Sequence, residues 1–128
     1  SIFELTKELS YKNSAKALRI AAYIGSAAKF AIPMATSALY THFYRILKYG
    51  ALLSSNPHPG NDQKAKILAV NPYFFQEYDA AVRNYPVKKA MAVIALLKEY
   101  DFKGKGGDVG EATPAELMVE LTAKILNI

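Results

Sequence analysis

The sequence contains no cysteine and no tryptophan, and only two of its 128 residues are histidines. Without cysteine, the chain can form no disulfide bond, no thiolate nucleophile and no cysteine-ligated zinc site. The two histidines, His42 and His58, fall on different predicted elements and lack the H-x-x-x-H spacing of a helical metal site. We therefore expect no metal and no cofactor, and we expect His42 to lie on the flank of a helix.

Long apolar runs are also missing. A membrane span needs roughly 18 to 20 consecutive apolar residues, and the apolar run from Ile20 is interrupted by Ser26 and Lys29. With 128 residues, 52% of them hydrophobic, the chain has the size and composition of one compact domain, residues 1–128. It begins with Ser1 rather than Met, and a helical pattern follows at once, so we expect it to be part of a longer polypeptide.

Acidic residues are missing between Glu8 and Asp62. Residues 1–60 carry seven basic and two acidic residues, whereas residues 61–128 carry nine of each, so the whole net charge of +5 lies in the first half. Such a region attracts phosphates or an acidic protein surface. We predict a partner or DNA surface on outward helix faces, with an ordinary solvated face as the alternative. The candidate residues are Lys12, Lys16, Arg19, Tyr23, Tyr44, Arg45 and Lys48.

Apolar residues recur at helical spacing along most of the chain, and no strand pattern is found. Caps and prolines predict where the helices begin and end. One helix begins at Asn13 or Ser14, and a central one extends from Pro33 to about Leu53. Further helices begin at Asn71 and Pro72, at Pro86, and at a Thr-x-x-Glu capping box from Thr113 to Glu116. A helical turn or two is expected over 63–69. The predicted fold is all-α, a single bundle of five or six helices.

The stretch VNPYFFQEYDAAVRNYP, residues 70–86, contains five aromatic residues. Aromatic side chains that stack on nucleic-acid bases lie on exposed basic surfaces, but this stretch contains Glu77, Asp79 and a single arginine. We therefore expect Phe74 and Tyr78 to pack in the core. The predicted shared core contains Phe74, Tyr78, Leu39, Phe43, Val93 and Leu97.

Catalytic motifs are scarce. Ser54, Ser55 and His58 lie close together in a predicted loop, but no orienting acid is nearby in the sequence. The glycine cluster of residues 103–110 follows a helix rather than a strand and matches no phosphate-binding motif, so it is interpreted as a linker. The residues alone indicate a basic, helical, non-catalytic module.

Several blocks of the sequence resemble one protein family. They are IFELTKEL, KALRI, LYTHFYRILKY, a closing LMVELTAKIL, and above all KILAVNPYFFQEYDAAVRNYPVKKAMAVIALLKEYDFKGKG at 66–106. In this order they resemble the C-terminal domain of the delta subunit of bacterial DNA polymerase III, which is part of the sliding-clamp loader. The resemblance covers nearly the whole chain.

The resemblance implies a specific role. In this family the C-terminal domain is a helical bundle that joins the other clamp-loader subunits in a ring-shaped collar. Full-length delta subunits have two further, N-terminal domains; they are similar in architecture to AAA+ proteins but lack a working ATPase, and the N-terminal domain opens the sliding clamp. The chain would thus be a cytoplasmic, non-catalytic oligomerisation module that helps to load the clamp onto primed DNA, and it would lack those N-terminal domains.

The resemblance implies at most an indirect contact of this domain with DNA. Some family members contact template DNA through an aromatic residue near the last helix, but KGKGGDVGEATP at 103–114 has none, so that contact is not carried over. Two alternatives remain: a basic helical DNA-binding domain that uses Lys12, Lys16, Arg19, Tyr23 and Arg45 on phosphates, and an unrelated helical protein-interaction adaptor. No membrane partner is expected.

Overall fold

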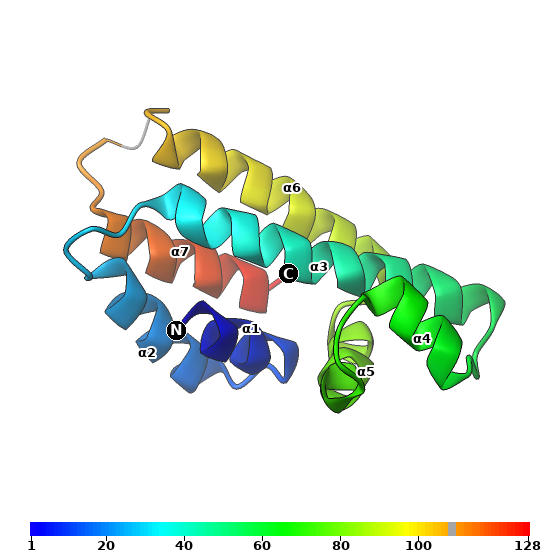
Figure 1. Cartoon of the computed structure of the whole chain (residues 1–128). Helices are drawn as coiled ribbons and strands as arrows, with labels where there is room; N and C mark the ends of the chain where they lie inside the picture. Colours follow the sequence, from blue (N-terminus) through cyan, green and yellow to red (C-terminus); the bar gives the residue numbers. More distant parts are fainter. Residues whose placement is uncertain (108–109) are drawn as a thin grey trace.

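The computed structural model describes residues 1–107 and 110–128, and within them the chain forms seven α-helices, one 3₁₀ turn and no strand (Figure 1). The elements are α1 (Ile2–Ser10), α2 (Ser14–Gly25), α3 (Ile32–Ser55), α4 (Asn61–Leu68), η1 (Pro72–Phe74), α5 (Phe75–Asn84), α6 (Val87–Gly104) and α7 (Pro114–Leu126). The all-α prediction is confirmed. The predicted number of five or six is too low, because α1 and α4 are complete helices of nine and eight residues.

Most helix starts follow the local sequence signals. Thr113 and Glu116 form the predicted capping box, since the Thr113 hydroxyl accepts from the Glu116 amide at 3.1 Å and the Glu116 carboxylate accepts from the Thr113 amide at 3.0 Å. Pro33 lies in the first turn of α3. Asn13 precedes α2 but does not cap it with its side chain, which instead donates to the Glu8 carboxylate at 2.5 Å. A hydrogen bond to a residue of the preceding helix can therefore take the place of the expected cap at the start of α2.

The longest helix, α3, is central, as predicted. It packs along its length on α6 and also touches α1, α4, α5 and α7 (Figure 1). The two long helices are antiparallel, because Gly104 near the end of α6 meets Ile32 at the start of α3, and Val87 at the start of α6 meets Gly50. A Cβ atom added at Gly104 would lie 2.6 Å from the Ile32 Cβ, so a larger residue there would push the helices apart.

The core contains five of the six residues predicted for it. Tyr78, Leu39, Phe43, Val93 and Leu97 are buried and belong to one cluster. The prediction for Phe74 is wrong, because its side chain is 44% exposed and Phe75 is buried in its place. The chain enters α5 through the 3₁₀ turn η1, where residues advance about 120° instead of 100°. That change of phase places Phe75 and Tyr78, at i and i+3, on the inner face.

Small residues bring α2 and α7 close together. Ala17, Ala21 and Gly25 lie one turn apart on α2 and are all buried. At Gly25 an added Cβ would lie 2.6 Å from the Ala115 Cα and 3.2 Å from the Met118 Cβ. The backbones can approach this closely because Gly25 has no side chain.

Candidate functional site

The outer face of α2 carries three of the predicted surface residues. Lys16, Arg19 and Tyr23 are exposed, with 80% of Tyr23 accessible. Ala17 and Ala21 occupy the opposite face, which packs on α7. The predicted outward orientation is therefore confirmed for Lys16, Arg19 and Tyr23.

An apolar depression begins beside Tyr23. Its volume is about 530 Å³, and Ile24, Phe30 and Met34 form part of its lining. Met34 is 64% exposed although it is fully apolar. Exposed apolar side chains that gather in one patch are typical of protein–protein contact sites.

Two of the predicted surface lysines have partners within the chain. Lys16 Nζ lies 3.4 Å from the buried carboxylate of Glu8, so the acid at the border of the acid-free stretch partly neutralises this lysine. Lys12 is only half-exposed, donates to the Leu126 carbonyl at 3.3 Å and lies over the Tyr85 ring. A cation at this position stabilises the C-terminal end of α7, whose last carbonyls lack helical partners. Lys12 therefore serves the fold of the domain itself.

The other three predicted residues lie on α3. Tyr44 stacks on Tyr40 with ring centroids 5.8 Å apart, and Lys48 lies 4.9 Å from the Tyr44 centroid. Arg45 points to a different side, where it lines a pocket with Tyr78. Because α2 packs mainly on α7 and α1, whereas α3 packs mainly on α6, the α2 and α3 residues do not form one packed stripe.

A buried polar cluster joins α1, α3 and α5. Ser10 Oγ lies 2.7 Å from His42 Nε2, and the Tyr78 hydroxyl lies 3.0 Å from His42 Nδ1. Burial lowers the pKa of His42 to about 3, and the positive charge of Arg45 acts in the same direction. The imidazole is therefore neutral at physiological pH, with both ring nitrogens hydrogen-bonded. The prediction that His42 lies on a helix flank is wrong.

The composition of this cluster invites comparison with a catalytic triad. Among the described residues, Glu77 has the only carboxylate within 4.0 Å of the imidazole, with its Oε2 3.8 Å from His42 Nε2. That is the same nitrogen that meets Ser10, whereas a triad base uses its other nitrogen to hold the acid. Ser10 is also completely buried, so no substrate reaches its hydroxyl. The cluster therefore orients three helices and does not activate a nucleophile.

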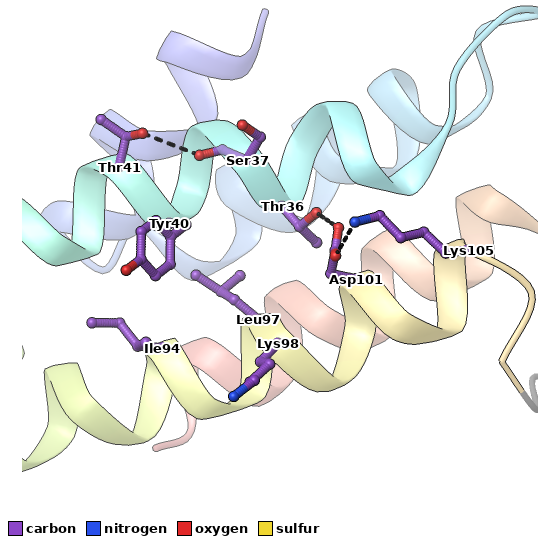
Figure 2. Close-up of a pocket in the computed structure, with 9 residues that line it drawn as sticks. All are labelled: Thr36, Ser37, Tyr40, Thr41, Ile94, Leu97, Lys98, Asp101 and Lys105. Atoms are coloured by element: carbon purple, nitrogen blue, oxygen red, sulfur yellow. Dashed lines mark hydrogen bonds and ion pairs between the residues drawn. The ribbon is translucent and has the colours of Figure 1, made fainter.

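A second surface feature is a groove between α3 and α6, shown in Figure 2, with a volume of about 520 Å³. Its wall on α3 includes Tyr40, and its wall on α6 includes Ile94 and Lys98. At one end, Asp101 accepts from the Thr36 hydroxyl at 2.8 Å and pairs with Lys105 at 2.7 Å. This groove could not be predicted from helical periodicity, because its two walls are about 60 residues apart in the chain.

Metal sites and membrane-spanning helices are absent from the part of the chain that the structure describes. Residues 1–107 and 110–128 contain no group of three or more potential metal ligands. Over the same ranges, no helix has the length and hydropathy needed to cross a membrane. Part of the predicted glycine linker, residues 108–109, lies outside the described residues.

A comparison of the chain with known protein families, with curated proteins and with solved structures found no match.

Proposed function

We propose that this chain is the helical collar module of a clamp-loader delta subunit, a non-catalytic domain that holds the subunit in the loader ring through contacts with other loader subunits. The complete subunit would belong to the DNA polymerase III holoenzyme and would reach the sliding clamp through domains outside this chain. Its role would be mechanical, because a collar transmits movements between subunits and needs no active site of its own.

The proposal rests on the sequence blocks of the resemblance, whose residues connect the helices of this fold. In the Arg-Asn-Tyr-Pro block, the Asn84 amide donates to the Ser10 carbonyl and the Tyr85 hydroxyl donates to the Leu9 carbonyl, both at 2.8 Å. These bonds attach the end of α5 to the last turn of α1. Residues that make specific hydrogen bonds between helices constrain the fold more strongly than amino-acid composition alone does.

The other strong block makes comparable contacts. In LLKEYDFKGK, residues 96–105, the Tyr100 hydroxyl donates to the Glu120 carboxylate on α7, while Asp101 accepts from Thr36 on α3. In the Asn-Pro-Tyr-Phe block, the side-chain oxygen Oδ1 of Asn71 accepts from the Tyr73 amide at 2.8 Å and caps η1. The resemblance thus extends to residues that define how α1, α3, α5, α6 and α7 meet.

The outer face of α2 is the surface that we propose for a neighbouring subunit. Arg19 and Tyr23 belong to residue types that are enriched at interface hot spots. They lie one turn apart, and Tyr23 lines the apolar depression that contains Met34. An exposed apolar patch with an arginine one turn away suits a protein partner better than a polyanion, which requires a larger number of unpaired cations.

A pair of double variants tests this surface. We expect the substitutions Arg19→Ala and Tyr23→Ala to weaken incorporation into a reconstituted loader by about 2 kcal/mol or more per hot-spot residue. The matched control, Arg83→Ala with Tyr73→Ala, removes the same residue types from the exposed side of η1 and α5 and should change assembly by less than about 0.5 kcal/mol. Circular dichroism is used to check that both double variants are folded.

Three other outcomes would change the proposal. If the control variant alone impaired assembly, the partner surface would lie on α5. If the unmodified chain failed to join loader subunits but bound DNA with a steep dependence on salt, the alternative of a DNA-binding domain would be favoured. If it did neither, the alternative of an unrelated adaptor would remain.

A further inference from the structure

A pocket opens between α1, α3 and α5, beside the buried cluster that contains His42 and Tyr78. Its volume is about 290 Å³, which suits a small organic group. Phe3 and Phe74 stay 80% and 44% exposed at its walls, so the domain does not cover these apolar surfaces with its own side chains. The apolar residues of the lining are Ile2, Phe3, Ala38, Val70 and Phe74.

Among the described residues, Glu77 is the one acid that lines the pocket. Its side chain is only 15% exposed, yet no donor in the described part of the chain lies at hydrogen-bond distance from its carboxylate. The nearest nitrogen, His42 Nε2, is 3.8 Å away on a neutral imidazole, which is too far for a hydrogen bond. A largely buried carboxylate without a donor gains free energy from a cation that reaches it.

The threonines of the pocket add further acceptors. The Thr6 hydroxyl donates to the Phe3 carbonyl at 3.0 Å, and the Thr41 hydroxyl donates to the Ser37 carbonyl at 3.2 Å. Because a hydroxyl has a single proton, both oxygens can only accept from a ligand. A primary ammonium group carries three donors and no acceptor, so it matches this excess of acceptors.

The aromatic walls favour the same charge. Phe3, Phe74 and Tyr78 all line the pocket. The faces of aromatic rings carry partial negative charge and attract cations, whereas they do not attract anions. An ammonium ligand therefore gains from the walls as well as from the carboxylate.

Arg45 is a cation of the same lining, but it acts on other groups. Burial raises the pKa of Tyr78, and a hydrogen bond and the charge of Arg45 lower it. Burial also raises the pKa of Glu77, and there the charges that contribute are those of Lys7 and Glu8. Neither Arg45 nor Lys7 lies within 4.0 Å of the Glu77 carboxylate. The chain itself thus supplies Glu77 with no cation at salt-bridge distance.

We propose that this pocket binds a primary amine on an apolar body, with the ammonium group paired with Glu77 and the apolar body in contact with Phe3 and Phe74. The same chemistry occurs in free organic amines and in a lysine side chain of another protein. The inference goes beyond the proposed function and does not depend on it, because Lys16, Arg19 and Tyr23 on the outer face of α2 do not line this pocket.

Two other classes of ligand fit the pocket less well. A carboxylic acid would pair with Arg45, but its negative charge would share a small cavity with Glu77 and with the acceptor oxygens of the two threonines. A neutral apolar molecule would use the walls and would leave the Glu77 carboxylate without a donor. An amine uses both the walls and the acceptors.

Three compounds with one phenyl group test the inference on the isolated chain. They are 2-phenylethylamine, 2-phenylethanol and 3-phenylpropanoate, which carry a cationic, a neutral and an anionic head. Binding is followed by NMR shifts at Val70 and Phe74. We expect the amine to bind at least about 10-fold more tightly than the alcohol, and the propanoate to bind more weakly than both. Equal binding of amine and alcohol, tightest binding of the propanoate, or no binding of the amine would overturn the inference.

A neutral isostere of the carboxylate sharpens the result. In Glu77→Gln, affinity for the amine should fall at least about 10-fold, whereas affinity for the alcohol should change by less than about 2-fold. The control Glu99→Gln makes the same charge change on a side chain of α6 that is 55% exposed and should leave both affinities unchanged. Equal losses of amine affinity in the two variants would indicate attraction to net charge only and would contradict a site.

A wall variant gives a second test that does not depend on Glu77. Phe74→Ala removes an exposed ring of the lining and should weaken the amine and the alcohol by similar factors. Unchanged affinity of both compounds in this variant would mean that they bind elsewhere on the chain and would overturn the inference.

A fourth compound distinguishes the two sources of the amine. Nα-acetyl-lysine methylamide presents the ammonium group as a protein does. If it binds more tightly than 2-phenylethylamine and is weakened by Glu77→Gln, the ligand is a lysine of another protein; the reverse order assigns the pocket to small amines. Because no loader subunit is used, failure of the amines leaves the proposed function standing, and failure of the chain to join a loader leaves the amine result unaffected.

Discussion

Two regions of this domain hold helices together by different physical means. Where α2 meets α7, small residues such as Ala21 and Gly25 allow close approach of the backbones, and contact is mainly steric. Where α1 meets α3 and α5, the side chains of Ser10, His42 and Tyr78 form a buried hydrogen-bonded cluster. Steric packing sets the distance between helices, whereas buried hydrogen bonds also fix how each helix is placed along and around its axis.

The difference has a functional meaning under the proposed role. The proposed partner surface lies on the outer side of α2, and the groove lies between α3 and α6. A scaffold that transmits movement must keep such surfaces in a fixed relation. Close packing on one side and a satisfied polar cluster on the other both contribute to that rigidity.

The largest effect is expected at the start of α5, where adjacent phenylalanines have opposite environments. Phe75→Ala should lower the free energy of unfolding by about 3 to 5 kcal/mol, because it leaves a cavity in the core. Phe74→Ala should cost less than about 1 kcal/mol, because that side chain is 44% exposed. Urea denaturation of both variants measures the difference. Similar losses of stability in the two variants would mean that the 3₁₀ turn η1 does not direct Phe75, rather than Phe74, into the core.

The contact of α2 with α7 can be broken by a single methyl group. Gly25→Ala should cost near the upper end of the roughly 1 to 3 kcal/mol seen for overpacking, because the new Cβ meets the Ala115 backbone. Gly60→Ala is the control, since no atom lies within 4 Å of its added Cβ, and it should change stability by less than about 0.5 kcal/mol. Thermal or urea unfolding provides the measurement. Tolerance of Gly25→Ala would show that the two helices can separate at little cost.

Acidification should weaken the polar junction and leave the contact of α2 with α7 unaffected. His42 has a folded-state pKa of about 3, below the value of 6.5 in an unfolded chain. The unfolded state therefore binds more protons between these values, and stability is lost as pH falls below about 6.5. From pH 7 to pH 5 we expect a loss of about 2 kcal/mol, at a slope of up to about 1.4 kcal/mol per pH unit.

Neighbouring groups modify this dependence. Burial raises the pKa of Glu77, so the folded state retains a proton on this carboxyl at higher pH and the loss from His42 is partly offset. His58 is exposed, so His58→Gln should keep the full slope, whereas His42→Gln should flatten it whatever its absolute stability. Urea midpoints at several pH values measure both slopes. If the slope disappeared in His58→Gln instead, the pH dependence of stability would come from His58 and not from His42.

The smallest effect concerns one hydrogen bond at the same junction. Tyr85→Phe removes the donor to the Leu9 carbonyl and should cost about 1 kcal/mol, because that carbonyl also accepts from the Lys12 amide and is not left unsatisfied. Tyr73→Phe removes a hydroxyl from a side chain that is 82% exposed and should have no measurable effect. Both are compared by urea denaturation. Equal stability of the two variants would indicate that the bond to α1 contributes little to the junction.

The sequence by itself determined the helical class, most helix limits and the outward face of α2. These features follow from signals within a few residues, such as the capping box at Thr113, the proline at position 33 and the apolar period of Ala17 and Ala21. Local signals were sufficient because helix ends and helix faces depend on neighbours within about one turn.

Tertiary structure alone decided the roles of the residues whose partners are distant in the chain. His42 meets Ser10 across 32 residues and Tyr78 across 36, so its burial could not be inferred from its helical neighbours. Phe74 and Phe75 fit helical spacing equally well until the 3₁₀ turn sets their phase. The α3–α6 groove likewise exists only because two antiparallel helices bring Tyr40 and Ile94 together. Contacts between side chains on different helices depend on how the helices pack, and helical periodicity carries no information about that packing.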